Sequence, residues 1–148
     1  MEQAKSTVAN DTSFNHINED HKSIFNYIEK LNTISQHPSD FEYAISTLER
    51  FISFFLEHTI KEEQLLQQYL PSEVVKEHIS LHQNELLFLD ESLVQLKAHL
   101  SAQTIQRIAI SLEKEFKNHI YRNDRKIIQQ LIAAKNRSQS GSNPFNLM

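Results

Sequence analysis

Residues 1 to 140 contain no glycine, and the single glycine of the chain is Gly141. Hairpin turns, phosphate-binding loops and dinucleotide-binding turns need glycine, because a residue without a Cβ adopts positive φ freely and lets the backbone approach a ligand closely. The sequence therefore excludes most β-rich and nucleotide-binding folds. Its 148 residues suit one domain that buries on the order of 70% of its unfolded surface around one core.

The composition narrows the chemistry further. The chain has no cysteine, which excludes disulfides, thiolate nucleophiles, iron–sulfur clusters and thiolate zinc sites. Histidine and carboxylate side chains are the strong metal ligands that remain. With 15 Lys plus Arg against 19 Asp plus Glu, the chain lacks the basic stripe that nucleic-acid binding requires, so we expect no nucleic-acid partner.

No membrane contact is expected either. Residues 1–10 lack the apolar segment of a signal peptide, and no apolar run approaches the roughly 20 residues of a membrane span. We therefore expect a cytoplasmic protein.

Two interior prolines and a serine mark three joints between helices. Proline is favoured in the first turn of a helix, and serine is a common N-cap. Apolar residues recur three and four positions apart between these joints, which is typical of amphipathic helices. We predict an all-α, up-down-up-down antiparallel four-helix bundle over residues 14–135, with flexible ends at 1–13 and 136–148. The predicted helices are about 14–34, Ser39 or Asp40 to about 70, Pro71 to about His99, and Ser101 to about Lys135.

Histidine or carboxylate side chains interrupt the apolar stripe of every predicted helix. Residues four apart lie one above the other on a helix face, so such pairs can converge on one point. Asp124 lies five residues after His119, and on a regular α-helix this spacing turns Asp124 to the edge of the face that carries His119. Its side chain would then have to reach sideways to the other donors. The interrupting residues are His21, His58 with Glu62, His78 with His82, and His119 with Asp124.

The level of each donor along the bundle axis can be estimated from the number of residues between it and the nearest joint. The last three helices place their donors in one layer, whereas His21 falls about six residues, or about 9 Å, from the level of His58. Any one of these histidines could be a satisfied core residue. Seven buried polar groups without partners would cost several kcal/mol, so the pattern favours a buried cation. His16, His37 and His99 are expected at the surface or in loops.

Five imidazoles and two carboxylates exceed the needs of one tetrahedral zinc ion and suit two octahedral, iron-like ions. If Glu62, Asp124 and one hydroxide each bridge both ions, a single coordination position stays open. Unequal shares of histidine place that position on one ion, where a small diatomic such as O₂ could bind. The same donors would also suit manganese.

The sequence resembles the hemerythrin family, specifically bacterial hemerythrin-like proteins, over about residues 14–132. The resemblance rests on four segments that match the family's ligand positions in order and spacing: 17–25 (INEDHKSIF), 58–63 (HTIKEE), 78–82 (HISLH) and 119–124 (HIYRND). It implies a four-helix bundle with a non-haem di-iron centre and an oxo or hydroxo bridge. The implied protein ligands are His78, His82 and His119 on one iron, His21 and His58 on the other, and Glu62 and Asp124 as bridges.

The resemblance also implies reversible O₂ binding by a carrier, store or sensor, with no catalysed reaction. Several positions depart from the family, however. Glu85 and Glu115 stand where Phe and Trp are common, Thr59 replaces another aromatic residue, and Arg122 lies one turn from His119. The two acids would face each other beside the metals. They either lean out toward water or place a carboxylate near the open position, where it could protonate a bound peroxide.

Other functions remain open at this point. The same centre could serve an enzyme acting on peroxide or NO, or a redox or iron-handling protein, and a bundle without metal could be a plain interaction module. A ferritin-like centre is disfavoured, because none of the five proposed histidines has Glu three residues before it. The oligomeric state is left open.

Overall fold

The computed structural model describes residues 12–141, and every regular element in this range is helical, which confirms the all-α prediction. The last long helix is continuous along the chain but changes its winding in the middle. The elements are α2 (Thr12–Ile34), a short 3₁₀ turn η1 (Pro38–Asp40), α3 (Glu42–Tyr69), α4 (Ser72–Ala98), α5 (Ala102–Asn118), the π-helical segment η2 (His119–Asp124) and α6 (Arg125–Gly141).

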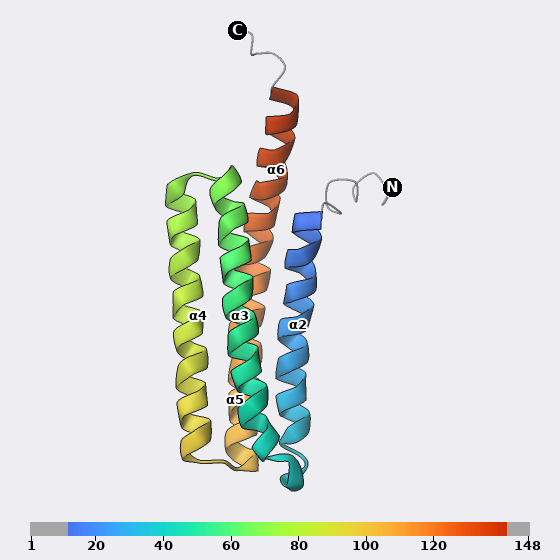
Figure 1. Ribbon diagram of the computed structural model, residues 1–148, viewed down its shortest axis with the longest axis vertical. Coiled ribbons are helices and arrows are strands. Elements are labelled where there is room, and N and C mark those ends of the chain that lie inside the picture. Colours follow the sequence, from blue (N-terminus) through green and yellow to red (C-terminus); the bar gives the residue numbers. More distant parts are fainter. Residues whose placement is uncertain (1–11, 142–148) are drawn as a thin grey trace.

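The described elements form four long helical rods: α2, α3, α4, and a last rod that consists of α5, η2 and α6 in succession. The rods lie side by side (Figure 1). Short connections join successive rods at alternate ends of the molecule. The rod α2 packs on α3 and α5, and α3 packs on α4. None of the helices described in residues 12–141 combines the length and apolar character needed to cross a membrane.

The joints follow the predicted signals with one exception. Ser101 caps α5 by accepting a hydrogen bond from the backbone N–H of Thr104, and Pro71 directly precedes α4. Pro38 starts the 3₁₀ turn η1 instead of the long helix, so the predicted start at Ser39 or Asp40 is wrong and α3 begins at Glu42. The early start fails because the backbone N–H groups of Asp40 and Phe41 bond to His37 and Pro38, which closes a tight turn.

The outer helices extend into the segments that the sequence analysis assigns to flexible ends. The first helix already begins at Thr12, and α6 continues through Gly141, so residues 12–13 and 136–141 are helical. The rest of both predicted ends, 1–11 and 142–148, lies outside the described residues.

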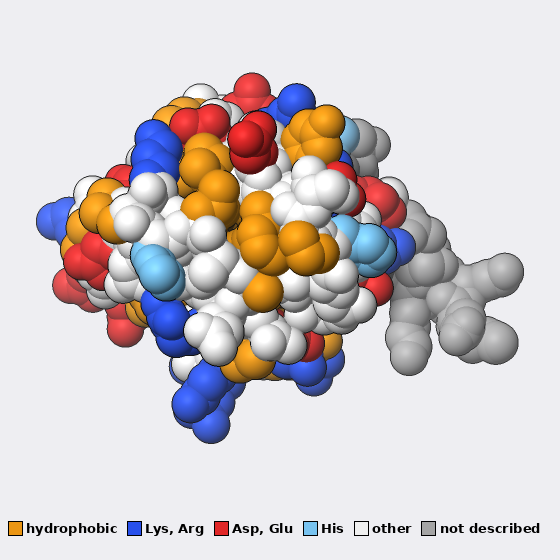
Figure 2. Space-filling view, turned by 90° about the horizontal axis from the view of Figure 1, so that it is seen from below, with side chains coloured by type: hydrophobic (Ala, Val, Ile, Leu, Met, Phe, Trp, Pro, Cys, Tyr) orange, Lys and Arg blue, Asp and Glu red, His pale blue; other side chains and the backbone are white. Residues whose placement is uncertain are grey.

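Two apolar clusters fill the interior, one on each side of a polar layer. On each rod, buried apolar residues from the two clusters flank the polar ones, as Ile17 and Ile24 flank His21. At the end that carries the α2–α3 and α4–α5 connections, hydrophobic side chains gather near the centre and charged ones lie mostly at the periphery (Figure 2). The larger cluster includes Ile24, Phe55, Leu89 and Phe116; the smaller one is Ile17, Leu66, Val75, Ile127 and Leu131.

Candidate metal centre

The polar layer consists of the seven side chains that the sequence singled out. Every rod contributes at least one of them, and His21, the most exposed, retains only 8% of its accessible surface. The donors are His21 on α2, His58 and Glu62 on α3, His78 and His82 on α4, and His119 and Asp124 on η2. The structure therefore brings all seven together.

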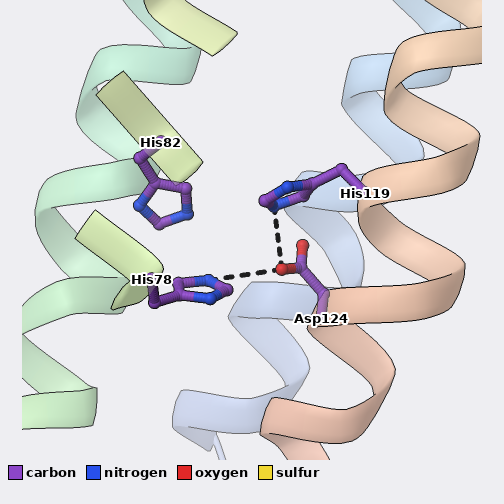
Figure 3. Close-up of side chains that lie close together, drawn as sticks. All are labelled: His78, His82, His119 and Asp124. Atoms are coloured by element: carbon purple, nitrogen blue, oxygen red, sulfur yellow. Dashed lines mark ion pairs between the residues drawn. The ribbon is translucent and has the colours of Figure 1, made fainter. Parts of the chain in front are cut away.

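The seven side chains form two groups, each of which could hold a metal ion. One group is His78, His82, His119 and Asp124; the other is His21, His58, Glu62 and Asp124. We call them the three-histidine group and the two-histidine group. Figure 3 shows the members of the first group pointing toward one another across the space between α4 and the last rod.

Asp124 belongs to both groups and gives one oxygen to each. Its Oδ1 lies 2.9 Å from His119 Nε2 and 3.3 Å from His78 Nε2 (Figure 3). Its Oδ2 lies 2.9 Å from His21 Nε2. One carboxylate oxygen thus faces each group, which is the arrangement of a bridging ligand.

Glu62 divides its oxygens in the same way. Its Oε1 lies 2.8 Å from His78 Nε2 and 2.9 Å from His82 Nε2, within the three-histidine group. Its Oε2 is directed to the other group, 3.7 Å from His58 Nε2. Both carboxylates therefore connect the two groups.

Metal ions fit this layer on two counts. Two donors at right angles on an ion with bonds of about 2.0–2.1 Å lie about 3 Å apart, which matches the separations between Nε2 atoms and carboxylate oxygens. Several of the converging atoms are also buried without any hydrogen-bond partner: Nε2 of His21, His58, His82 and His119, Oε2 of Glu62 and both oxygens of Asp124. Buried polar atoms of this kind require a compensating ligand.

The π-helical segment η2 places Asp124 in the layer. From the sequence we expect Asp124 to reach sideways from the edge of its helix face, and this expectation is wrong. It assumed a regular α-helix through residues 119–124. In η2 the backbone N–H of Arg125 bonds to the carbonyl of Ile120, five residues earlier, which widens the turn. His119 and Asp124 then lie on one face, so the spacing of five was itself the signal for a π turn, an element common at functional sites.

The predicted misfit of His21 is also wrong. Its ring centroid lies 5.5 Å from that of His58, so the two histidines are neighbours. The count failed because it folded the chain symmetrically about residue 36 or 37. The actual connection, residues 35–41, contains η1 and shifts α3 relative to α2.

Two further carboxylates contact the imidazoles at Nδ1, on the side of the ring that faces away from the converging Nε2 atoms. Asp20 Oδ2 lies 3.0 Å from His58 Nδ1, and Glu63 Oε2 lies 2.7 Å from His82 Nδ1, both with hydrogen-bond geometry. Such contacts orient the ring and leave Nε2 free for a metal. Sequence reasoning missed both residues, because no spacing within one helix links Asp20 to His58 or Glu63 to His82.

Glu85 also lies behind an imidazole. It is 3% exposed, so of the two alternatives left open by the sequence, the one in which it leans toward water is wrong. Its Oε2 is 2.7 Å from His119 Nδ1, the ring nitrogen that faces away from Asp124, although the ring N–H does not point squarely at the oxygen.

The other positions that depart from the family pattern differ in their exposure. Glu115, which was expected to face Glu85, is half-buried, and Arg122 is exposed. Thr59 is buried and donates its hydroxyl to the carbonyl of Leu56. The structure thus gives no support to a pocket in which Glu85 and Glu115 face each other beside the donors.

The donors perturb one another strongly in the metal-free protein. Burial alone would raise the pKa of Glu62, but contacts with His78 and His82 hold that pKa below its ordinary value. Burial alone would lower the histidine pKa values, yet Asp124 and Glu62 raise the pKa of His78 to about 9. Asp124 and Glu85 likewise raise the pKa of His119 to about 10. Both imidazoles are therefore protonated at neutral pH without metal.

Metal binding should consequently release protons. His78 and His119 both belong to the three-histidine group, so an ion that binds there at pH 7 must displace about two protons from them. Apparent affinity should rise with pH, by roughly tenfold per pH unit for each displaced proton, until the pH passes the raised pKa values. Calorimetry in buffers of different ionisation enthalpy measures the proton count. Affinity independent of pH between 6 and about 9 would contradict this protonation state.

An open cleft of about 290 Å³ reaches the two-histidine group between α2 and α3. His58 and Glu62 form part of its wall, together with Asp20, Lys61 and other mostly polar side chains: His16, Ile17, Gln64, Leu65 and Gln68. A larger groove of about 410 Å³ lies between α2 and α5, but none of the seven donors lines it. Of these two openings, only the cleft between α2 and α3 gives a small molecule access to the donors.

Comparison with known proteins agrees with this site. The sequence model of the hemerythrin HHE cation binding domain matches residues 12–131, a range that contains all seven donors. Searches of curated proteins and of solved structures gave no match. The matched range covers most of the chain, and the chain therefore belongs to the hemerythrin HHE cation-binding family.

Proposed function

We propose that this protein binds O₂ reversibly at a non-haem di-iron centre, as a carrier, store or sensor that catalyses no reaction. The proposal takes the four rods as an antiparallel up-down-up-down bundle, in agreement with their short connections at alternate ends. The observation that carries it is the division of the two carboxylates, Glu62 and Asp124, each of which directs one oxygen to each donor group.

The unequal groups support a single open position. His78, His82 and His119, together with Glu62 and Asp124, would hold one ion in the three-histidine group. In the two-histidine group, the same carboxylates and one histidine fewer would hold the second ion, so that this ion would offer the open position to an exogenous molecule. The cleft between α2 and α3 reaches His58 and Glu62, so it leads to the group with the open position.

Bound iron would supply the electrons and the open coordination position that O₂ binding requires. The chain's own residues hold this centre in the bundle interior. His21 and His58 would orient the accessible ion, and the buried layers around Ile17 and Ile24 separate it from bulk water. Such exclusion limits loss of the reduced state through side reactions.

A second candidate function uses the same centre for peroxide or NO chemistry, or for iron handling. The polar wall of the cleft favours it, because Lys61, Gln64 and Gln68 can admit hydrogen-bonding molecules as well as O₂. Glu85 no longer favours it, since its carboxylate contacts His119 on the side away from Asp124.

Mixing the reduced, iron-loaded protein with O₂ in a stopped-flow spectrometer distinguishes the two functions. Reversible binding predicts a new visible spectrum that persists for minutes and disappears when O₂ is removed under argon. Metal analysis of the same sample should give about two irons per chain, as the two donor groups require. Immediate, irreversible conversion to the diferric spectrum would contradict O₂ carriage and favour the second function.

A further inference from the structure

Negative charge is distributed unequally behind the two donor groups. In the three-histidine group, Glu63 lies 2.7 Å from His82 Nδ1 and Glu85 lies 2.7 Å from His119 Nδ1. Within the described residues, the ion pairs of these two carboxylates involve histidines alone. Neither carboxylate is therefore neutralised by a lysine or arginine.

The two-histidine group differs in this respect. Asp20 Oδ2 lies 3.0 Å from His58 Nδ1, but the same oxygen is 3.5 Å from Lys61 Nζ. The lysine offsets the negative charge of Asp20. Within the described residues, the three-histidine group thus has two carboxylates behind its ligands that no lysine or arginine pairs with, and the two-histidine group has one carboxylate that a lysine pairs with.

Glu85 needs positive charge most clearly. It is 3% exposed, and its Oε1 is buried without a hydrogen-bond partner. A buried carboxylate that lacks full hydrogen bonding is costly unless a cation lies nearby. A metal ion at Nε2 of His119 would provide that charge across the ring in the loaded protein, in place of the proton that it displaces from the imidazole.

We propose that Glu63 and Glu85 make the three-histidine group the tighter of the two metal sites and the first to fill, with Glu85 acting as a positioning residue through His119. The inference rests on the proposed dinuclear centre and concerns its two halves separately. A carboxylate at Nδ1 fixes the ring and strengthens Nε2 as a donor, and loss of such a partner typically weakens metal binding by about 10- to 100-fold.

Calorimetric titration of the metal-free chain with Co(II) alone tests this order. The parent should bind in two distinguishable steps. His119→Ala should lose the tighter step, whereas His21→Ala should lose the weaker one. Glu85→Gln, which keeps the shape and removes the charge, should weaken the tighter step by about tenfold or more and leave the weaker step unchanged.

Three comparisons make the test specific to charge at this position. Glu91→Gln removes an exposed carboxylate from the same helix and should change neither step. Glu85→Asp, which restores the charge, should recover part of the lost affinity. In the iron-loaded protein, Glu85→Gln should raise the midpoint potential, and a tenfold shift of the one-electron equilibrium corresponds to about 59 mV.

The outcomes separate this inference from the proposed function. A parent that takes up no Co(II) contradicts the metal centre itself. A parent that binds two ions while Glu85→Gln keeps the tighter step within twofold contradicts only the present inference. Circular dichroism of the metal-free variants checks folding, and Glu63→Gln provides the same test at a partly exposed carboxylate if the Glu85 variants do not fold.

Discussion

Removal of both metal ions should lower the free energy of unfolding by about 4 kcal/mol for each site that was saturated at about 1,000 times its dissociation constant. For a chain of this length, a loss of about 4 kcal/mol at one site lowers the melting temperature by on the order of 10 °C, and the loss of both ions lowers it by roughly twice as much. The physical reason is the polar layer itself, in which seven buried ligand atoms lack hydrogen-bond partners without an ion. Thermal unfolding before and after chelation measures the effect.

The metal-free protein should nevertheless remain folded. His78 and His119 gain protons and pair with Glu62, Asp124 and Glu85, which compensates part of the buried charge. Anaerobic addition of Fe(II) should restore the melting temperature, whereas Ca²⁺, which prefers oxygen ligands, is the control and should not. A melting temperature that neither chelation nor Fe(II) changes would contradict the metal centre.

Asp124→Ala should abolish metal binding more completely than His82→Ala. Asp124 gives an oxygen to both donor groups, while the imidazole of His82 belongs to one group. We expect His82→Ala to lose the visible charge-transfer bands and retain about one ion per chain, and Asp124→Ala to retain almost none. Metal quantitation and the visible spectrum of the purified variants measure both losses.

Asp90→Ala removes an exposed carboxylate from α4 and provides the matched control, with full metal content expected. Unchanged bands in His82→Ala would exclude His82 as a ligand. Equal metal loss in the two variants would contradict the assignment of His82 to one donor group and of Asp124 to both.

Local periodicity accounts for most of what the sequence predicted correctly. The helices and their joints at Pro71 and Ser101 follow from residue spacing and capping, which act within a few residues of the chain. The seven candidate donors were singled out for the same reason, because each interrupts an apolar stripe on its own helix, and the structure brings them together while their role as ligands stays a prediction. Burying them without a ligand is unfavourable, and that penalty indicated a metal before any distance was known.

Two geometric predictions failed because they extended ideal geometry across an irregular segment. The height of His21 depended on the connection 35–41, whose 3₁₀ turn changes the relative position of α2 and α3. The direction of Asp124 depended on a uniform α-helix through η2, where the backbone instead forms a π turn. Small changes in rise and winding move side chains by several ångströms, so counting residues cannot resolve them.

The sequence by itself determined an all-helical chain that contains seven potential metal ligands, because both properties are encoded in short-range spacing and side-chain chemistry. Only the tertiary structure decided which oxygen of Glu62 and Asp124 faces which donor group, and which carboxylate contacts His58, His82 or His119. Those contacts form between residues on different rods, and their register is set by packing of the whole interior. No pattern along a single helix contains that information.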